Sequence, residues 1–328
     1  MTAFSVLDLS PIVEGGDARR ALLETTELAR TAERLGFTRF WLAEHHNMPG
    51  IASAATAVAL AHVAANTETI RVGSGGVMLP NHAPMLVAEQ FGTLEALHPG
   101  RIDLGLGRAP GTDGATARAL RRYFEAADQF PRDVLELQAF LADPVEGQGV
   151  TAWPGAGSKV PIWLLGSSLF SAELAAQLGL PFAFASHFAP EMLLQALRVY
   201  REGFRPSAQL DRPYAMAAIN VFAADSDAEA QRLSTSMQQS FAAVVTGQPG
   251  RLKPPVDDIA AVLDRRQIAA VESRLTYAAI GGEAAVRRKL SEFIALTKVD
   301  EVMITGMIFE LEPRRRSLEI TARAAMGL

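Results

Sequence analysis

The sequence of 328 residues contains no cysteine. A disulfide framework, a thiolate zinc site, an iron–sulfur cluster and a cysteine nucleophile are therefore all excluded. The sequence also lacks an apolar stretch near the roughly 20 residues that a membrane span requires. Its first residues, Met1–Ser5, include no basic region and no cleavage site for export. We therefore expect a cytoplasmic protein that does not insert into membranes.

An excess of positive charge is absent as well. The formal net charge is −5, and lysine and arginine do not gather in a basic stripe. Nucleic acid and anionic membrane surfaces are therefore not expected as partners. Hydrophobic residues make up 49% of the chain and charged residues 20%. This composition is that of an ordinary globular protein with a large core.

Short apolar segments alternate with helix-like segments along the whole chain. The segments expected as strands are Phe4–Leu9, Thr38–Ala43, Thr69–Leu79, Arg101–Gly107, Pro161–Leu165, Pro181–Ser186, Tyr214–Ala223 and Glu301–Met307. Alternation of strands and helices predicts a parallel sheet covered by helices. Eight such units without a linker predict a closed (β/α)8 TIM barrel, and residues 1–328 are expected to form one domain.

Two regions between the expected strands are less regular. A loop over Ala109–Thr116 and a long amphipathic helix over Arg118–Leu141 are expected before the fifth strand. Residues 244–276 contain several prolines and glycines, with a helix expected to begin near Asp257. Long irregular connections in compact domains are often functional. We therefore expect residues 244–276 to be an insertion at the carboxyl-terminal rim of the barrel and a candidate lid.

An alanine-rich helix is expected over Ser53–Ala65. Its small side chains would allow a second helix to approach closely, which makes it a candidate contact in a homodimer. The alternative explanation is the high helix propensity of alanine alone.

Polar residues follow the second expected strand as Glu44-His45-His46. Neighbouring side chains on a strand point to opposite faces, so the two imidazoles are poorly placed to bind one metal ion. The remaining histidines, His62, His82, His98 and His187, do not supply the ligand spacing of a metal-dependent hydrolase. No metal is therefore expected. The preferred interpretation is one histidine at the barrel mouth that acts as a base or donor, and the alternative is a pair of structural histidines.

Glycine residues lie within the third expected strand, and glycine and serine residues follow the fifth. Glycines within Gly73–Gly76 indicate either a bulge or the close approach of a flat ring. Arg108 follows the fourth strand, and Gly166, Ser167, Ser168 and Ser171 stand where a helix begins after the fifth. Arginine and a helix N-terminus both bind phosphate well. Because the two strands are neighbours in a barrel, we expect one phosphate at the rim, although the serines could instead cap the helix.

The chain resembles the bacterial luciferase-like family of flavin-dependent monooxygenases, in its single-component, alkanal monooxygenase-like branch. The resemblance covers essentially the whole chain. Its most specific part is the run Leu94–Arg101 followed by Leu104–Arg108. The other dense matches are Trp41–His46, Val72–Pro80, Glu89–Arg108 and Gly166–Pro181.

The resemblance implies an α/β barrel that binds reduced FMN at its carboxyl-terminal mouth. His45 falls on the family's catalytic histidine, with Glu44 and His46 beside it. Gly75 and Gly76 fall on a pair that is joined by a non-prolyl cis peptide bond behind the flavin ring. Arg108, Ser168 and Ser171 fall on positions that hold the FMN phosphate, which extends the candidate cofactor site to Gly166 and Ser167.

The implied activity is oxygenation of a small organic substrate, for example an aldehyde. FMN reduced by a separate, transiently bound flavin reductase would react with O2 to give a C4a-(hydro)peroxyflavin. Gly107 stands where luciferases carry a reactive cysteine, and Ser167 where they carry a glutamate, so light emission is not expected. Trp153, His187, Phe188 and residues 244–276 are expected to line the substrate pocket.

Three other functions remain open from the sequence. A deazaflavin-dependent hydride-transfer oxidoreductase would share the barrel, and a non-catalytic protein could bind flavin without using oxygen. The third is the metal-dependent hydrolase that the histidine spacing disfavours.

Overall fold

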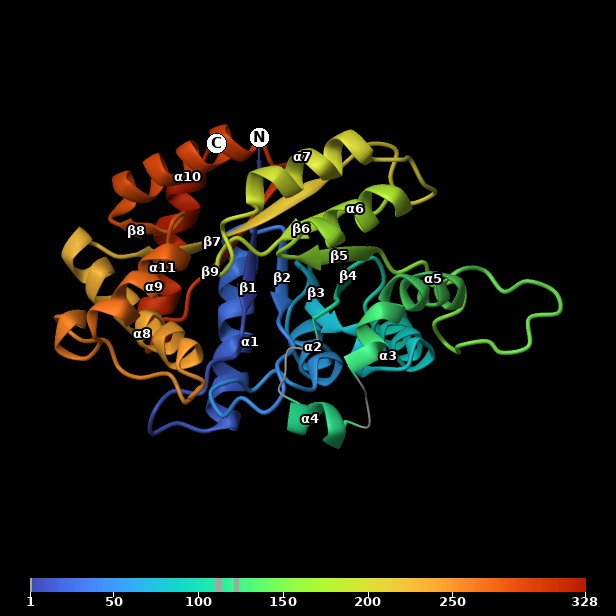
Figure 1. The fold of residues 1–328 in the computed structure, drawn as a ribbon, viewed down its shortest axis with the longest axis horizontal. Coiled ribbons are helices and arrows are strands. Elements are labelled where there is room, and N and C mark those ends of the chain that lie inside the picture. Colours follow the sequence, from blue (N-terminus) through green and yellow to red (C-terminus); the bar gives the residue numbers. More distant parts are fainter. Residues whose placement is uncertain (1, 110–113, 121–123) are drawn as a thin grey trace.

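A closed barrel of parallel strands lies at the centre of the computed structural model, which describes residues 2–109, 114–120 and 124–328 (Figure 1). The barrel strands are β1 (Ala3–Asp8), β2 (Arg39–Leu42), β3 (Arg71–Met78), β4 (Ile102–Gly107), β5 (Ile162–Gly166), β6 (Phe182–Phe184), β7 (Ala215–Ala223) and β9 (Glu301–Thr305). Each pairs with the next, and β9 closes the circle between β7 and β1. The expected eight-stranded parallel barrel is thereby confirmed.

Helices surround this barrel (Figure 1). The α-helices are α1 (Ala18–Arg34), α2 (Thr56–Ala65), α3 (Pro84–Leu97), α4 (Gly114–Ala119), α5 (Phe130–Leu141), α6 (Leu169–Leu178), α7 (Leu193–Gly203), α8 (Asp227–Val245), α9 (Arg265–Arg274), α10 (Glu283–Thr297) and α11 (Leu311–Ala325). The chain ends meet on one side, where the Thr2 amide donates to the Leu328 carbonyl at 2.9 Å. No helix among the described residues is long and apolar enough to cross a membrane.

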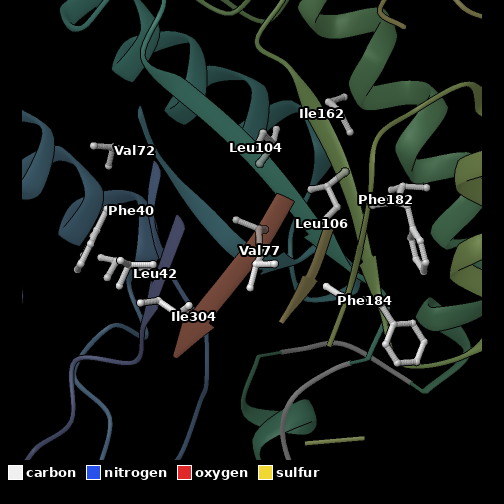
Figure 2. Packing of buried hydrophobic residues seen from close by; sticks show 14 of the residues in the cluster. Phe40, Leu42, Val72, Val77, Leu104, Leu106, Ile162, Phe182, Phe184 and Ile304 are labelled. Carbon is white, nitrogen blue, oxygen red and sulfur yellow. The ribbon is translucent and has the colours of Figure 1, made fainter. Parts of the chain in front are cut away.

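The main core lies between the barrel and the helices. Side chains alternate along a strand, so every second residue of a barrel strand points outward into this layer. Phe40 of β2 pairs in register with Val72 of β3, and both are 0% exposed. Leu104 of β4 pairs with Ile162 of β5 in the same layer, as Figure 2 shows. Burial of such a side chain contributes about 1.5–3 kcal/mol, and this layer therefore holds the helices against the barrel.

The inner face of the barrel carries paired charges near the amino ends of the strands. Arg39 donates to Asp103 and to Glu301, each at 2.8 Å. Arg71 also binds Asp103, at 2.6 Å, and the Tyr214 hydroxyl donates to Glu301 at 2.9 Å. The two carboxylates are 1% and 0% exposed. Buried charges are tolerated when they are paired and hydrogen-bonded, and this network fills the closed end of the barrel.

The prediction of one long helix over Arg118–Leu141 is wrong. The structure has the short helix α4 ending at Ala119, a 3-10 turn, η2, over Phe124–Gln129, and a separate helix, α5, from Phe130. Pro131 stands in the first turn of α5, where proline is tolerated because its missing amide hydrogen needs no partner. The loop expected over Ala109–Thr116 is also partly wrong, since α4 begins at Gly114. Residues 110–113 of that loop lie outside the described residues.

Residues 244–276 contain more helix than the sequence suggests. Helix α8 continues to Val245, a 3-10 turn, η3, covers Ile259–Ala261, and α9 follows. The helix expected near Asp257 begins at Arg265 instead, because Asp264 forms a capping box with Gln267. A further short strand, β8 (Ala279–Gly281), pairs with β7 outside the closed circle. Its three residues are too few for an apolar pattern to reveal.

The buried charge network gives a prediction for stability. Arg39→Met would leave Asp103 and Glu301 buried without their shared cation. We expect the free energy of unfolding to fall by about 3–5 kcal/mol, the usual effect of removing one partner from a buried ion pair. Urea denaturation measures this change.

Arg316→Met is the matched control. Arg316 pairs with Asp225 and Glu319, but its side chain is 44% exposed. Exposed pairs contribute little, so the control should unfold at nearly the wild-type urea concentration. Equal effects of the two substitutions would show that the barrel interior does not depend on Arg39.

Candidate functional site at the barrel mouth

One buried carboxylate organises the residues that follow β2. The Glu44 side chain is 2% exposed, and its Oε1 accepts hydrogen bonds from His46 Nε2 and His82 Nε2, each at 2.8 Å. Ser53 donates to the carbonyl of Ala43 at 2.6 Å and so fixes the backbone just before Glu44. Burial alone would raise the pKa of Glu44, but the hydrogen bonds from the two imidazoles hold that pKa below its usual range. Glu44 is therefore a carboxylate at neutral pH.

His82 was not among the residues expected at the site. It follows η1 (Leu79–Asn81), a 3-10 turn that leads away from the end of β3. His82 lies 38 positions from Glu44 in the chain, and no spacing rule connects the two. Only the adjacency of β2 and β3 in the barrel brings them together. The ligand atoms of Glu44, His46 and His82 lie within 4.8 Å of one another, close enough to hold a metal ion. The expectation that no metal binds stays a prediction.

His45 differs from its two neighbours in its contacts. It takes no part in the Glu44 hydrogen bonds, and its Nδ1 is buried without a partner among the described residues. Burial lowers the pKa of His45, an effect that the nearby Glu44 carboxylate partly offsets. The imidazole is therefore neutral at pH 7 and can accept a proton. A buried neutral imidazole with a free ring nitrogen has the properties of a general base.

The glycines of β3 lie against the neighbouring strands. The Gly75–Gly76 peptide bond is cis, as the family resemblance implies, and the pairing of β3 with β4 shifts register between Ser74 and Val77. A Cβ atom on Gly76 would lie 2.7 Å from the carbonyl oxygen of Gly105. A Cβ atom on Gly75 would lie 2.7 Å from Leu7 Cδ1. Packing against backbone therefore requires glycine at position 76, whereas at position 75 the Cβ atom would press on the end of the flexible Leu7 side chain. The contact of both glycines with a flavin stays a prediction.

Arg108 meets the first turn of α6, as expected from adjacent strands. Its guanidinium carbon lies 4.2 Å from the centre of the Phe170 ring. Ser168 is the N-cap residue of α6, but its side chain makes no capping hydrogen bond. Ser171 packs directly against Gly166. The capping alternative is therefore not supported for Ser168, and the arginine, the helix N-terminus and the hydroxyls form a candidate anion site.

The residues expected to line the substrate pocket lie at opposite ends of the barrel. His187 and Phe188 follow β6 and therefore lie at the carboxyl-terminal mouth. Trp153 lies in the segment that leads from α5 into β5, and it is 66% exposed. Segments that enter a strand lie at the amino-terminal end of a parallel barrel. The expectation for Trp153 is therefore wrong, and the long loop after α5 projects away from the barrel in Figure 1.

The fold and the polar groups at the strand ends define a parallel α/β barrel with a candidate active site at its carboxyl-terminal mouth. The sequence profile described as "Luciferase-like monooxygenase" matches residues 2–300. A protein of that description from Escherichia coli K12 is 54% identical over 319 residues, covering 97% of this chain and 95% of the relative. The chain therefore belongs to the luciferase-like monooxygenase family.

Further relatives carry more specific names. An N-acetyl-S-alkylcysteine monooxygenase from Bacillus subtilis is 41% identical over 239 residues, covering 71% of each chain. The crystal structure of apo-MsnO8 is 34% identical and has a TM-score of 0.87, covering 99% of this chain and 98% of the other.

Two more distant structures show the fold alone. One is the oxygenating constituent of 3,6-diketocamphane monooxygenase from Pseudomonas putida with FMN, at 17% identity, a TM-score of 0.73 and coverage of 98% and 97%. The other is an F420-dependent secondary alcohol dehydrogenase, at 15% identity and a TM-score of 0.72, with 98% of each chain covered.

The hydrogen bonds of Glu44 give a prediction with a defined pH dependence. Glu44→Gln keeps an acceptor oxygen but loses the charge, so we expect it to lower the free energy of unfolding by about 1–2 kcal/mol at pH 7. Because folding lowers the pKa of Glu44, the carboxylate contributes fully above the ordinary glutamate pKa of about 4.3. The contribution is lost as the pH falls through the lower, folded-state pKa.

Urea denaturation of both proteins between pH 3 and pH 8 measures this difference. The gap between wild type and Glu44→Gln should be constant at neutral pH and should narrow in acid. A gap that widened in acid would show that Glu44 is protonated in the folded protein.

Proposed function

We propose that the protein is a flavin-dependent monooxygenase that uses reduced FMN and O2 to oxygenate a small organic substrate. The observation that carries this proposal is the meeting of Arg108 with the first turn of α6, one strand away from the cis Gly75–Gly76 pair. The family membership and the FMN complex of a protein with the same fold support it. The proposal includes a separate flavin reductase as electron donor and a homodimer as the working form.

The residues present fit the parts of FMN. The phosphate would bind Arg108, the free amides at the start of α6, and the hydroxyls of Ser168 and Ser171. An anion there is favoured by the helix dipole, by the guanidinium charge and by donors that have no capping role. No carboxylate among the described residues forms an ion pair with Arg108, so no described neighbour neutralises its charge.

The flavin ring would lie over the Gly75–Gly76 peptide at the end of β3. The half-buried faces of both glycines present backbone without a side chain, which suits contact with a flat ring. When bound, reduced FMN supplies the electrons that activate O2, so that one oxygen atom reaches the substrate and the other leaves as water. The protein's own contribution is to hold the ring, to exclude water and to move protons.

His45 is the residue that would move the proton. Its buried Nδ1 has no partner among the described residues, and its lowered pKa keeps it neutral near pH 7. Glu44 would be a weaker base, because its hydrogen bonds with His46 and His82 hold its pKa below the usual range. Glu44 instead holds these two imidazoles in place beside His45. The three residues of the Glu44-His45-His46 run thereby have two separate roles.

A deazaflavin-dependent hydride transfer remains the second candidate, since an F420-dependent dehydrogenase has the same fold. The two functions differ in cofactor and in oxygen use. Titration of the protein with FMN and with F420 separates the two: tight binding of F420 without oxygen consumption would replace the monooxygenase proposal.

Arg108→Ala should weaken binding of FMN about tenfold or more, because a charged hydrogen bond contributes roughly 1.5–3 kcal/mol. Quenching of flavin fluorescence measures the dissociation constant. Arg212→Ala is the control, since Arg212 lies in the exposed turn before β7, which leads into the amino end of that strand. Equal affinity of Arg108→Ala and the control would place the phosphate elsewhere.

His45→Ala should retain binding of FMN and lose most substrate-dependent oxygen consumption. In the wild type, the pKa of His45 lies below its ordinary value of about 6.5 because of burial. Turnover should therefore be constant above that pH and should fall only in more acidic buffer, as the imidazole becomes protonated. Full turnover of His45→Ala, measured with an oxygen electrode, would remove His45 from the chemistry.

A further inference from the structure

Two buried polar side chains on the strands opposite β3 have an atom without a partner. Asn220 of β7 is 1% exposed, and Thr305 of β9 is 5% exposed. Among the described residues, neither Asn220 Oδ1 nor Thr305 Oγ1 has a hydrogen-bond partner. An unpaired buried polar atom destabilises the folded protein, because it has lost its hydrogen bonds to water. Two such atoms together indicate a place where a ligand completes the hydrogen bonding.

Both side chains point into the barrel. Met216, Ala218 and Met303 belong to the inner cluster of the barrel. Every second residue of a strand faces the same side. Asn220 therefore faces inward like Met216 and Ala218 on β7, and Thr305 faces inward like Met303 on β9. The two residues also pair in register between β7 and β9. The unpaired atoms therefore lie on adjacent strands and face the same interior.

His187 extends this surface toward His45. The side-chain amide nitrogen of Asn220 donates to the carbonyl of His187, and Ser186 donates to the carbonyl of Ala218 at 2.6 Å. These bonds fix the segment after β6 against β7. His187 Nδ1 is a third buried atom without a partner among the described residues. We call His187, Asn220 and Thr305 the polar wall.

The polar wall carries no net charge. Burial is the main cause that lowers the pKa of His187 to about 4, and nearby His45 has a smaller effect in the same direction. Its imidazole is therefore neutral at pH 7, and the other two side chains are an amide and a hydroxyl. A charged ligand group placed here would lose its hydration without gaining a counter-charge, which is costly.

The position of the polar wall separates it from the proposed flavin site. Around the closed barrel, β7 lies four strands from β3 in either direction. The Gly75–Gly76 pair lies on β3, and Arg108 follows β4, so the flavin contacts lie on the opposite half of the mouth. A ring against the glycines would turn its free face toward β7. A substrate that reacts at that face would then lie next to the polar wall.

We propose that the polar wall binds the substrate through an uncharged group that both donates and accepts hydrogen bonds, such as a hydroxyl or an amide. This inference rests on the proposed function for the position of the flavin. Asn220 uses its amide nitrogen within the protein, so its Oδ1 requires a donor from the ligand. The Thr305 hydroxyl can donate or accept. A simple aldehyde has no donor and would leave Asn220 Oδ1 unpaired.

Matched probe pairs test this choice of ligand. Each pair has a hydroxyl compound and its methyl ether: 6-hydroxyhexan-2-one with 6-methoxyhexan-2-one, and 4-(methylthio)butan-1-ol with its methyl ether. Binding to the protein loaded with oxidised FMN is followed by the flavin absorbance, so turnover is not needed. The wild type should bind the hydroxyl member of at least one pair about tenfold more tightly. Equal affinities, or no binding of either hydroxyl probe, would overturn the proposal.

Thr305→Val removes one unpaired hydroxyl at nearly constant shape. We expect the preference for the hydroxyl probe to fall to about threefold or less, with the FMN dissociation constant unchanged. Because Thr305 Oγ1 has no partner within the described protein, the melting temperature should stay the same or rise. An unchanged probe preference would overturn the proposal. A tenfold loss of FMN affinity would also overturn it, since Thr305 would then contact the flavin.

Thr297→Val is the matched control. Thr297 is 1% exposed, and its hydroxyl donates to the carbonyl of Phe293 at 2.7 Å in α10. This substitution should lower the melting temperature and leave the probe preference unchanged. The proposed function is tested separately by oxygen consumption with reduced FMN. Selective probe binding without any oxygenation would contradict the monooxygenase proposal but support the role of the polar wall. Oxygenation without probe selectivity would support the monooxygenase proposal and contradict the role of the polar wall.

Discussion

The paired charges inside the barrel fill its amino-terminal end and leave the carboxyl-terminal end for the candidate site. Arg39 of β2 joins Asp103 of β4 to Glu301 of β9, and so ties strands from the beginning and the end of the chain. Above this layer, the rings of Trp41 and Trp163 pack edge to face, with centroids 5.2 Å apart. Charged and aromatic side chains thereby fill the amino-terminal half of the interior. The inward positions nearer the carboxyl ends are small or uncharged, which leaves that end as the place for a ligand.

The strands of this barrel could be predicted from sequence because both of their faces are buried. β7 is buried at all nine positions, and such a strand is a nearly continuous apolar run that is easy to recognise. The predicted helix boundaries were wrong where they depend on individual residues and not on the hydrophobic pattern. Pro131 divides the expected long helix, and the capping box at Asp264 decides where α9 begins. These are local contacts of one or two side chains, and the hydrophobic pattern does not record them.

The candidate site was predicted only where one strand end supplied its residues together. Glu44, His45 and His46 are consecutive, and Arg108 follows a strand directly, so both groups could be found from the chain. His82 approaches Glu44 because β2 pairs with β3, and Thr305 approaches Asn220 because β7 pairs with β9. No spacing along the sequence connects the two members of either pair. Asn220 did leave a signal, since it is a polar residue within the apolar run Ala215–Ala223. A side-chain amide on a buried strand requires a hydrogen-bond partner.

The two halves of the mouth differ in charge, and this difference assigns a role to each. Arg108 and the N-terminus of α6 make the half beside β4 and β5 positive, which suits an anionic cofactor. The half beside β6, β7 and β9 is polar but neutral, because burial keeps His187 unprotonated. His45 follows β2, next to the glycines of β3, and is kept neutral in the same way. An anionic group bound at the half beside β6, β7 and β9 would lose its interactions with the Arg108 guanidinium and the helix dipole, and would contact only uncharged donors. In the proposed arrangement, electrostatics would therefore orient the ligands before any shape complementarity acts.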